Sequence, residues 1–247
     1  INHYRAQITY GVSEKTFGRG LHQKVSSVIL LRKMMTKIFQ ENSIIALVGP
    51  TAVGKTELSL ELANQLEAEI VCVDSVLVYR DFNIGAAKPS LEVRKKIPHY
   101  VIDVADPKDL FTAADYCRVA LEAIEEIQSR KKRVLLVGGS GMYLRALVQG
   151  MFKSPGSDPE IRKELEQEEN LYEKLKEVDR ESALSIHPND RYRILRALEV
   201  YRMTGNPVSQ FEKEHDGKKR LEVVKIGLNI DRKELHQRIE RRTKKML

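Results

Sequence analysis

Gly49-Pro50-Thr51-Ala52-Val53-Gly54-Lys55-Thr56 fills the phosphate-loop pattern G-x-x-x-x-G-K-[ST]. The apolar residues 44–48 before it predict a buried strand, and residues 55–66 after it carry apolar side chains at helical spacing. In such a unit the loop amides and the positive end of the helix dipole point at one anion. Lys55 adds a positive charge, and the Thr56 hydroxyl can hold a Mg²⁺ ion. The loop therefore predicts a site for a polyphosphate or a pyrophosphate, and leaves open whether that phosphate belongs to a nucleotide.

The composition is that of a globular protein with one large or two small domains. The chain has 247 residues, of which 42% are hydrophobic and 31% charged, so it can bury a full core. No apolar run reaches the length of a membrane span, and we expect no membrane partner. Cys72 and Cys117 are too few and too far apart for a disulfide framework or a zinc site. We therefore expect a reducing, cytoplasmic setting.

Positive charge is concentrated at the two ends of the chain. Residues 1–43 carry seven basic and two acidic side chains, a balance of +5, and residues 216–247 carry eleven and five, a balance of +6. This distribution suits a polyanionic partner such as a nucleic acid, but it equally suits a solvated lysine and arginine surface. Charge alone does not choose between them.

Strand and helix patterns alternate from residue 44 onward. Strands are predicted over 44–48, 69–73, 100–103 and 133–137, and helices over 55–66, 112–130 and 141–149. Parallel strands joined by crossover helices bury both faces of a sheet. The sequence therefore predicts an α/β fold, a P-loop-containing doubly wound parallel sheet in three layers.

Three breaks divide the chain into four parts. Residues 1–43 form a basic N-terminal extension of unknown role, with a short helical pattern over 25–39, and because residue 1 is isoleucine we expect a fragment or a processed product. Residues 44–150 form the P-loop core. Residues 151–215 contain charged helical patterns over 159–177 and 190–204 and predict an all-helical insertion domain that brings the second substrate or a lid. Residues 216–247 return to the core with a strand over 221–230 and a basic helix over 232–247.

Two further strand ends carry candidate site residues. Asp74 ends the apolar strand 69–73, and in a doubly wound sheet the carboxyl ends of the strands border the ligand crevice. Asp74 could hold a metal-bound water, accept a proton or cap a turn. The strand 133–137 ends in Gly138-Gly139-Ser140, where Ser140 could donate to a phosphate oxygen or only cap a helix.

Two arginines near the end of the chain are also candidates. Arg238 and Arg242 are four residues apart and share one helix face. There they could bind a phosphate or only be solvated. Their spacing leaves both possibilities open.

An ordered set of motifs carries a resemblance to a known family. The set comprises GPTAVGKT (49–56), DSVLVYR (74–80), NIGAAKP (83–89), PHY (98–100), FTAAD (111–115), GGS (138–140), HPND (187–190) and RILRALEV (193–200). In this order the motifs resemble those of the tRNA dimethylallyltransferases, over residues 44–247. Residues 1–43 have no counterpart in that family, and the family continues beyond the point where this chain stops.

The resemblance implies a substrate, a cofactor and a set of site residues. The phosphate loop 49–56 would hold the diphosphate of dimethylallyl diphosphate, with Mg²⁺ on Thr56. Asp74 would take the proton of the adenine amine next to the anticodon, while Ser140, Arg238 and Arg242 would stabilise the departing diphosphate. The implied contacts to the tRNA anticodon stem-loop, made by a monomer, are Asp74, Ser75, Val76, Leu77, Ser140, Arg162, Tyr192, Arg193, Ile194, Leu195 and Arg196. Ser140 and Leu77 stand where many members have threonine and glutamine.

Three other functions share parts of this pattern. A small-molecule P-loop kinase of the shikimate type, which is an ATP-binding protein, also places an aspartate after its second strand. An adenylate prenyltransferase would modify free nucleotides, although the helical segment 189–200 is similar to the tRNA type. A noncatalytic RNA-binding module would not require Asp74.

Overall fold

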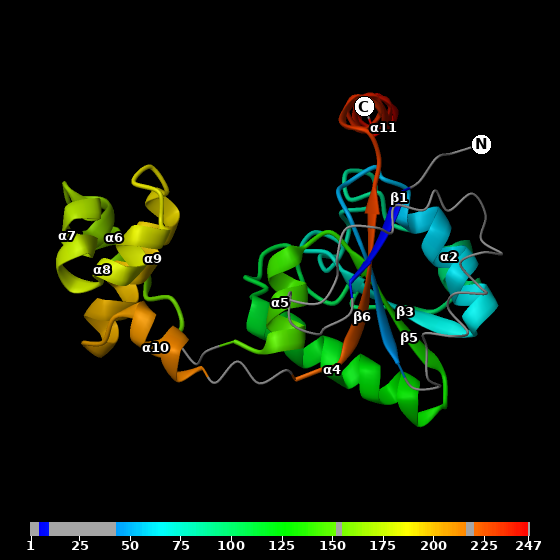
Figure 1. Ribbon diagram of the computed structural model, residues 1–247, viewed down its shortest axis with the longest axis horizontal. Helices are drawn as coiled ribbons and strands as arrows, with labels where there is room; N and C mark the ends of the chain where they lie inside the picture. The colour runs from blue at the N-terminus through cyan, green and yellow to red at the C-terminus, as the bar shows by residue number, and fades with distance from the viewer. Residues whose placement is uncertain (1–4, 10–42, 152–154, 216–219, 247) are drawn as a thin grey trace, which may run out of the picture. The chain divides into compact units, whose positions relative to one another are not determined.

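The computed structural model describes residues 5–9, 43–151, 155–215 and 220–246, and divides the chain into two compact units (Figure 1). One unit is formed by residues 1–149 and 219–247, and the other by residues 150–218. The division lies next to the sequence-based boundaries at 151 and 215. Each unit is described by itself below.

The first unit is built on a six-stranded sheet in the order β1-β6-β2-β5-β3-β4. The strands are β1 (Arg5–Thr9), β2 (Ile44–Val48), β3 (Ala68–Val73), β4 (His99–Tyr100), β5 (Arg133–Gly138) and β6 (Val223–Asn229). The five strands from β6 to β4 run parallel, and β1 pairs with β6 antiparallel. The predicted mixed α/β fold with a parallel sheet is confirmed. β1 lies inside the predicted N-terminal extension and was not foreseen, and the predicted helical pattern over 25–39 lies outside the described residues.

Alternate residues of the central strand β2 face opposite sides of the sheet. Ile45 and Leu47 belong to a core shared with α2 (Lys55–Leu66), whereas Ile44 and Ala46 belong to a second core shared with α4 (Ala113–Ser129) and α5 (Gly141–Gln149). Because side chains alternate along a strand, a strand covered by helices on both faces must be apolar throughout. The sequence IIALV of β2 meets this requirement.

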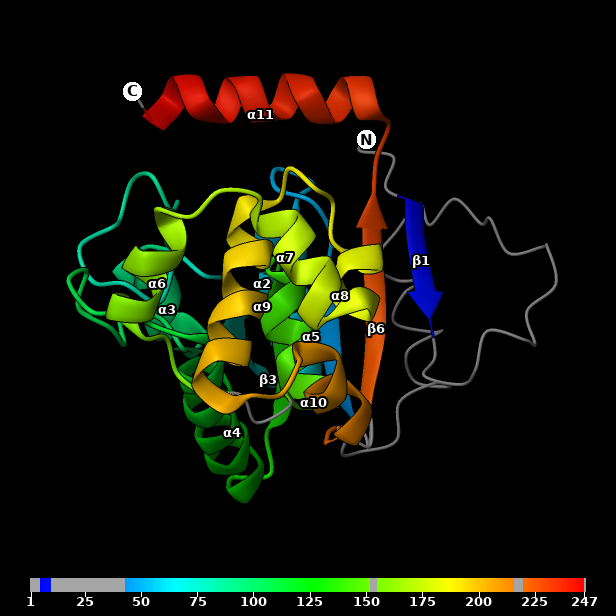
Figure 2. The ribbon, with the colours of Figure 1, turned by 90° about the vertical axis from the view of Figure 1, so that its left-hand side faces the viewer.

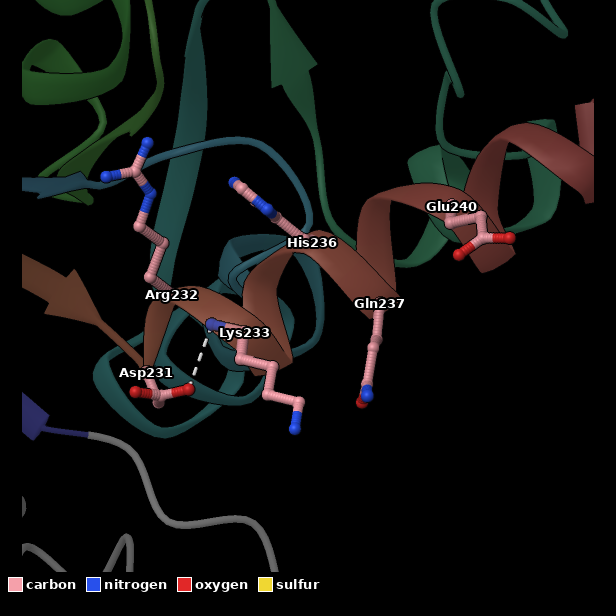
Figure 3. A pocket seen from close by; sticks show the side chains of 6 residues that line it. All are labelled: Asp231, Arg232, Lys233, His236, Gln237 and Glu240. Carbon is pink, nitrogen blue, oxygen red and sulfur yellow. Dashed lines mark hydrogen bonds between the residues drawn. The ribbon is translucent and has the colours of Figure 1, made fainter.

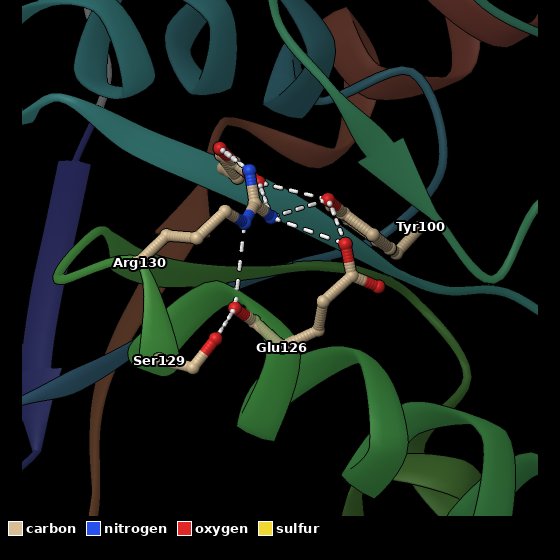
Figure 4. Close-up of polar contacts among 5 residues, drawn as sticks. Tyr100, Glu126, Ser129 and Arg130 are labelled. Carbon is tan, nitrogen blue, oxygen red and sulfur yellow. Dashed lines mark hydrogen bonds and ion pairs between the residues drawn. The ribbon is translucent and has the colours of Figure 1, made fainter.

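A polar network stabilises the start of β3. Glu69 is only 6% exposed and accepts two hydrogen bonds from the Arg130 guanidinium, at 2.9 and 2.8 Å. Tyr100 of β4 donates to Glu69 at 3.0 Å, and Glu126 of α4 joins the cluster (Figure 4). These bonds join β3, β4 and the end of α4. The predicted strand over 100–103 is wrong beyond Tyr100, because Val101 has a φ of 59° and leaves the extended conformation.

The first unit has two further helices. The short α3 (Leu91–Lys96) was not predicted. The basic α11 (Arg232–Met246) follows β6 directly (Figure 2) and begins where Asp231 accepts hydrogen bonds from the amides of Lys233 and Glu234. In the described part of the chain, no helix is both long enough and apolar enough to cross a membrane.

The second unit consists of helices around its own apolar core. They are α6 (Pro159–Glu166), α7 (Leu171–Val178), α8 (Arg180–Ser185), α9 (Arg191–Thr204) and α10 (Val208–Glu214). The prediction of one helix over 159–177 is wrong, because two helices occupy this range. α6 ends at Glu166, and α7 begins at Leu171 after Asn170, which has a φ of 56°. The core includes Leu165, Leu175 and Leu198.

Candidate active site

Four neighbouring strands end at the same edge of the sheet and carry the predicted site residues there. Val48 of β2 is paired with Gly138 of β5, and Gly138 is paired with Val73 of β3. The next residues along each strand are therefore neighbours: the phosphate loop after β2, Gly139-Ser140 after β5, and Asp74 after β3. On the other side of β2, β6 leads into α11. The sheet thus brings together four parts of the sequence that lie far apart in the chain.

The phosphate loop connects β2 to α2. Val53 is fully buried and anchors the loop, and Gly54, with a φ of 100°, precedes the first turn of α2 in a conformation that favours glycine. Lys55 donates to the carbonyl oxygens of Gly49 at 2.8 Å and Pro50 at 2.7 Å. Burial lowers the pKa of Lys55, an effect that the charge of Asp74 opposes and that of Arg242 reinforces. The ammonium group therefore lies within the electrostatic reach of both side chains.

Asp74 forms a turn directly after β3. Its Oδ1 accepts hydrogen bonds from the amides of Val76 at 2.8 Å and Leu77 at 3.2 Å, and the residue is half-buried. The turn-capping role considered from the sequence is therefore real, but it engages only Oδ1. Among the contacts seen in the described residues, Oδ2 has no hydrogen bond. Asp74 is thus a fixed carboxylate whose second oxygen is available to a ligand.

Gly138-Gly139-Ser140 lies between the phosphate loop and Asp74. A Cβ atom at Gly138 would be 1.9 Å from the Val73 carbonyl oxygen, so only glycine fits there. A Cβ atom at Gly139 would lie 3.5 Å from the Gly49 oxygen and 3.8 Å from Lys55 Nζ. Ser140 Oγ accepts a hydrogen bond from the Ser75 amide at 3.0 Å. Ser140 therefore joins the end of β5 to the end of β3, in addition to any capping of α5.

Helix α11 directs one arginine to the phosphate loop. Arg242 donates to Thr51 Oγ1 at 3.2 Å across 191 residues of sequence. Arg238 is 15% exposed and forms an ion pair with Glu234 at 2.6 Å. A hollow of about 630 Å³ also lies along α11, but neither Arg238 nor Arg242 lines it (Figure 3). The residues that line it are Asp231, Arg232, Lys233, His236, Gln237 and Glu240.

Thr56 is the predicted metal ligand, and it is exposed at the start of α2. Within the described ranges, no group of three histidine, cysteine or carboxylate residues could hold a metal ion by itself. Mg²⁺ usually binds through one or two protein oxygens while substrate phosphates and waters supply the rest. A single hydroxyl beside a phosphate loop fits that mode of binding.

The remaining predicted contacts lie in the helical unit, and they differ in exposure. The guanidinium of Arg162 lies 4.9 Å from the ring centre of Tyr192, whose side chain is 68% exposed. The Arg193 side chain is 71% exposed and pairs with Asp190 at 3.3 Å. Arg162 of α6 thus lies against Tyr192 at the start of α9, where Tyr192 and Arg193 are both exposed.

The other three predicted contacts of α9 have packing partners inside the helical unit. Ile194 and Leu195 are 2% and 4% exposed and belong to the core of the unit. Arg196 pairs with the fully buried Glu199 at 2.8 Å and donates to the Pro155 and Gly156 carbonyls. Their side chains hold the unit together.

Sequence reasoning assigned no role to one cluster of charges near this edge of the sheet. Lys88 and Arg94 both pair with Asp103, each at 2.6 Å. Lys88 belongs to the quoted run 83–89, but Asp103, the carboxylate that it shares with Arg94, is 15 residues further along the chain. No spacing rule predicts such a contact between loops.

A phosphate loop with Lys55 and Arg242 beside it can hold a phosphate-containing anion, and Asp74 places a carboxylate next to that position. Comparison with known proteins identifies the class. The sequence profile described as IPP transferase matches residues 77–247. The chain is 48% identical over 211 residues to tRNA dimethylallyltransferase 2 of Geotalea uraniireducens, covering 83% of this chain and 68% of that protein. It is 45% identical over 215 residues to tRNA dimethylallyltransferase of Geobacter metallireducens, covering 84% and 70%.

Solved structures give the same result. A eukaryotic dimethylallyltransferase acting on tRNA matches with a TM-score of 0.71 and 29% identity, covering 83% of this chain and 52% of that one. The tRNA isopentenylpyrophosphate transferase of Bacillus halodurans matches with a TM-score of 0.54 and 35% identity, covering 83% and 66%. This chain therefore spans about half to two thirds of the length of these two proteins.

Proposed function

This chain belongs to the family of tRNA dimethylallyltransferases, and on that premise we propose that it transfers a dimethylallyl group from dimethylallyl diphosphate to tRNA. The acceptor is the exocyclic amine of the adenosine 3′ to the anticodon, and diphosphate is released. The family is one of transferases that act on tRNA. The resemblance drawn from the sequence motifs is confirmed.

One observation carries the proposal: Lys55, Asp74, Ser140 and Arg242 come from four neighbouring segments and meet at one edge of the sheet. Lys55 belongs to the phosphate loop and is bonded to Gly49, and Arg242 of α11 is bonded to Thr51 of the same loop. Asp74 is held beside them by its turn and through the bond between Ser140 and Ser75. Cations on one side and a fixed carboxylate on the other suit a reaction that releases an anion and a proton.

In the proposed reaction the adenine amine attacks the allylic carbon of the donor. A carbon–nitrogen bond forms, the carbon–oxygen bond to the diphosphate breaks, and the amine loses one proton. Asp74 accepts this proton, because its Oδ2 is free of the turn hydrogen bonds. The amine is a weak nucleophile, so positioning by the carboxylate is part of the catalytic effect.

In the proposed reaction the phosphate loop acts as a P-loop and stabilises the leaving diphosphate. Loop amides and the start of α2 face the anion, while Lys55 and Arg242 supply positive charge as it departs. Arg238 is held by Glu234 on the same helix and acts one turn further from the loop. Thr56 would hold a Mg²⁺ ion that neutralises part of the diphosphate charge.

The helical unit is the proposed tRNA-binding insertion. Arg162, Tyr192 and Arg193 offer a cation, an exposed ring and a second cation at the start of α9. Such groups bind the phosphates and unstacked bases of an anticodon stem-loop. The target adenosine must leave the base stack to reach a site at the sheet edge, where the segment from Asp74 to Leu77 would contact it.

Two properties of the whole protein complete the proposal. We expect a monomer that works in the cytoplasm. Cys72 and Cys117 are both free and buried, which fits a reducing compartment.

Labelled donor tests the function directly. In separate reactions, the chain is incubated with dimethylallyl diphosphate, radiolabelled in the allyl group, and one acceptor: tRNA, AMP or ATP. We expect label only in tRNA. Label in AMP or ATP would support an adenylate prenyltransferase, and ATP-dependent turnover without any prenyl transfer would support a P-loop kinase. Tight tRNA binding without transfer would support a noncatalytic RNA-binding module.

A further inference from the structure

Three charged side chains meet behind the loop that follows Asp74. Asp103 Oδ1 pairs with Lys88 Nζ and Asp103 Oδ2 pairs with Arg94, both at 2.6 Å. The Lys88 side chain is only 2% exposed, and its Nζ also donates to the Tyr79 carbonyl at 2.6 Å. Removing one partner of such a pair leaves a buried charge without compensation. We refer to Lys88, Arg94 and Asp103 as the ion triad.

Backbone hydrogen bonds connect the ion triad to Asp74. The Asp103 amide donates to the Leu77 carbonyl at 3.1 Å, and the Leu77 amide donates to Asp74 Oδ1 at 3.2 Å. Val78, which is fully buried, accepts from the amides of Val104 and Ala105. A displacement of Asp103 would therefore be transmitted to the turn that holds the Asp74 carboxylate.

The backbone at Asp103 takes an uncommon conformation. Val101 and Asp103 both have a φ of 59°, and Val101 is a β-branched residue that is 3% exposed. Left-handed backbone is unfavourable for β-branched residues and persists only where the surroundings enforce it. Here Val101 is packed in the core on the α4 side of the sheet, and Asp103 is held by the ion triad and by its bond to Leu77.

Asp103 is ionised under ordinary conditions. Burial alone would raise the pKa of Asp103, but hydrogen bonds and charges from Lys88 and Arg94 outweigh it and hold the pKa below its usual value. Asp103 therefore keeps its negative charge near neutral pH.

We propose that Asp103 is a positioning residue for prenyl transfer, which acts through the ion triad and the Leu77 backbone to hold the Asp74 carboxylate in place. This inference rests on the proposed function. It predicts an effect on the chemical step that is larger than the effect on donor binding, because the phosphate loop is not part of this chain of contacts.

The strand β3 offers a matched control. Glu69 lies at its beginning and is held by Arg130 and Tyr100, whereas Asp74 follows its end. Glu69→Gln weakens a buried ion pair at the other end of β3, and its contacts include Tyr100 but neither the ion triad nor the turn that holds Asp74. Asp103→Asn removes the charge of Asp103 while keeping a residue type that tolerates left-handed backbone.

The experiment compares wild type, Asp103→Asn, Arg94→Gln and Glu69→Gln. For each protein we measure the melting temperature, the dissociation constant for dimethylallyl diphosphate, and the rate of single-turnover transfer to tRNA at saturating donor. We expect Asp103→Asn to lower the transfer rate about 10- to 100-fold with donor affinity within about twofold of wild type. Glu69→Gln should lower the melting temperature but leave the transfer rate nearly unchanged. Arg94→Gln, which keeps the pair between Lys88 and Asp103, should show a smaller loss of rate and remains decisive if Asp103→Asn does not fold.

Two results would overturn the inference. If Asp103→Asn, or Arg94→Gln in its place, transfers at the wild-type rate, the triad serves only the fold. The same conclusion follows if Glu69→Gln slows transfer as much as the triad variants do. A wild-type chain that transfers no label overturns both the proposed function and this inference. If the wild type is active, the proposed function stands and the variants test this inference alone.

Discussion

The Asp74 carboxylate has two oxygens with different surroundings. Oδ1 accepts the Val76 and Leu77 amides and is thereby fixed. Oδ2 has no such bond in the described residues, so it can take a proton while the turn is kept. A single side chain can in this way be both a structural cap and a general base.

Replacing Asp74 tests this division of labour. Asp74→Asn keeps an oxygen that accepts both turn amides but removes the basic oxygen. We expect the single-turnover transfer rate to fall by about two to four orders of magnitude, with dimethylallyl diphosphate still bound. Asp106→Asn is the matched control, because Asp106 Oδ1 accepts the Lys108 amide at 2.9 Å in a similar turn. Normal single-turnover transfer by Asp74→Asn would exclude Asp74 as the base.

Arg242 and Arg241 provide a comparison between adjacent residues. Arg242 contacts Thr51 in the phosphate loop, whereas the neighbouring Arg241 is exposed. We expect Arg242→Ala to raise the KM for the donor and lower kcat together, reducing kcat/KM about 100-fold, because a charge that stabilises the leaving group is lost. Arg241→Ala should leave both constants close to wild type. Equal kinetics of the two variants in steady-state assays would contradict a role for Arg242 at the diphosphate.

At the level of elements, the clearest sequence patterns led to the most accurate predictions. The strand over 44–48 and the helices over 55–66 and 141–149 have the predicted bounds, because each joins a long apolar pattern to a glycine-rich boundary. The short helices α3, α8 and α10 lacked such patterns and were missed. The split between α6 and α7 depends on the single left-handed residue Asn170, which periodicity does not reveal.

The same limit applies to the candidate site. Strand ends are local features, so Asp74 and Ser140 could be chosen from the sequence, and the order of strands then brought them together. The bond between Arg242 and Thr51 and the ion triad depend on loop paths. Loop paths follow from the packing of the whole unit, and no local pattern encodes them.

Helix α9 carries two arginines with opposite expected behaviour. Arg196 pairs with the buried Glu199, so we expect Arg196→Ala to lower the free energy of unfolding by about 1–3 kcal/mol. Arg193 is exposed, and Arg193→Ala should change stability by less than about 0.5 kcal/mol. If Arg193 binds a tRNA phosphate, its loss should reduce the slope of log affinity against log salt by about 0.9. Melting curves and tRNA titrations at several salt concentrations measure both effects; an unchanged salt slope would show that Arg193 does not contact the RNA backbone.

At the scale of the whole molecule, the chain contains two units with separate cores. The helical unit buries two carboxylates, Asp179 at 4% exposure and Glu199 at 0%. Asp179 accepts hydrogen bonds from Ser182 and from the Ser209 amide, so it joins the start of α8 to α10. Burial alone would raise the pKa of Asp179, but these hydrogen bonds outweigh it and hold the pKa below the ordinary value of 3.8.

This depressed pKa predicts how the stability of the helical unit depends on pH. The unfolded chain binds a proton at Asp179 more readily than the folded chain does, so the stabilisation is complete above the unfolded pKa and is lost as pH falls through the lower folded value. At neutral pH, Asp179→Asn should therefore be less stable than wild type. The difference should shrink as pH falls below about 4, where the unfolded chain begins to protonate Asp179 and the folded chain follows at lower pH. Hydrogen exchange, followed peptide by peptide and corrected for the intrinsic effect of pH, reports the helical unit separately from the α/β unit. A stability difference between wild type and Asp179→Asn that stays constant from pH 7 to pH 3 would contradict this assignment, because the linkage requires its charge-dependent part to shrink as the carboxylate is protonated.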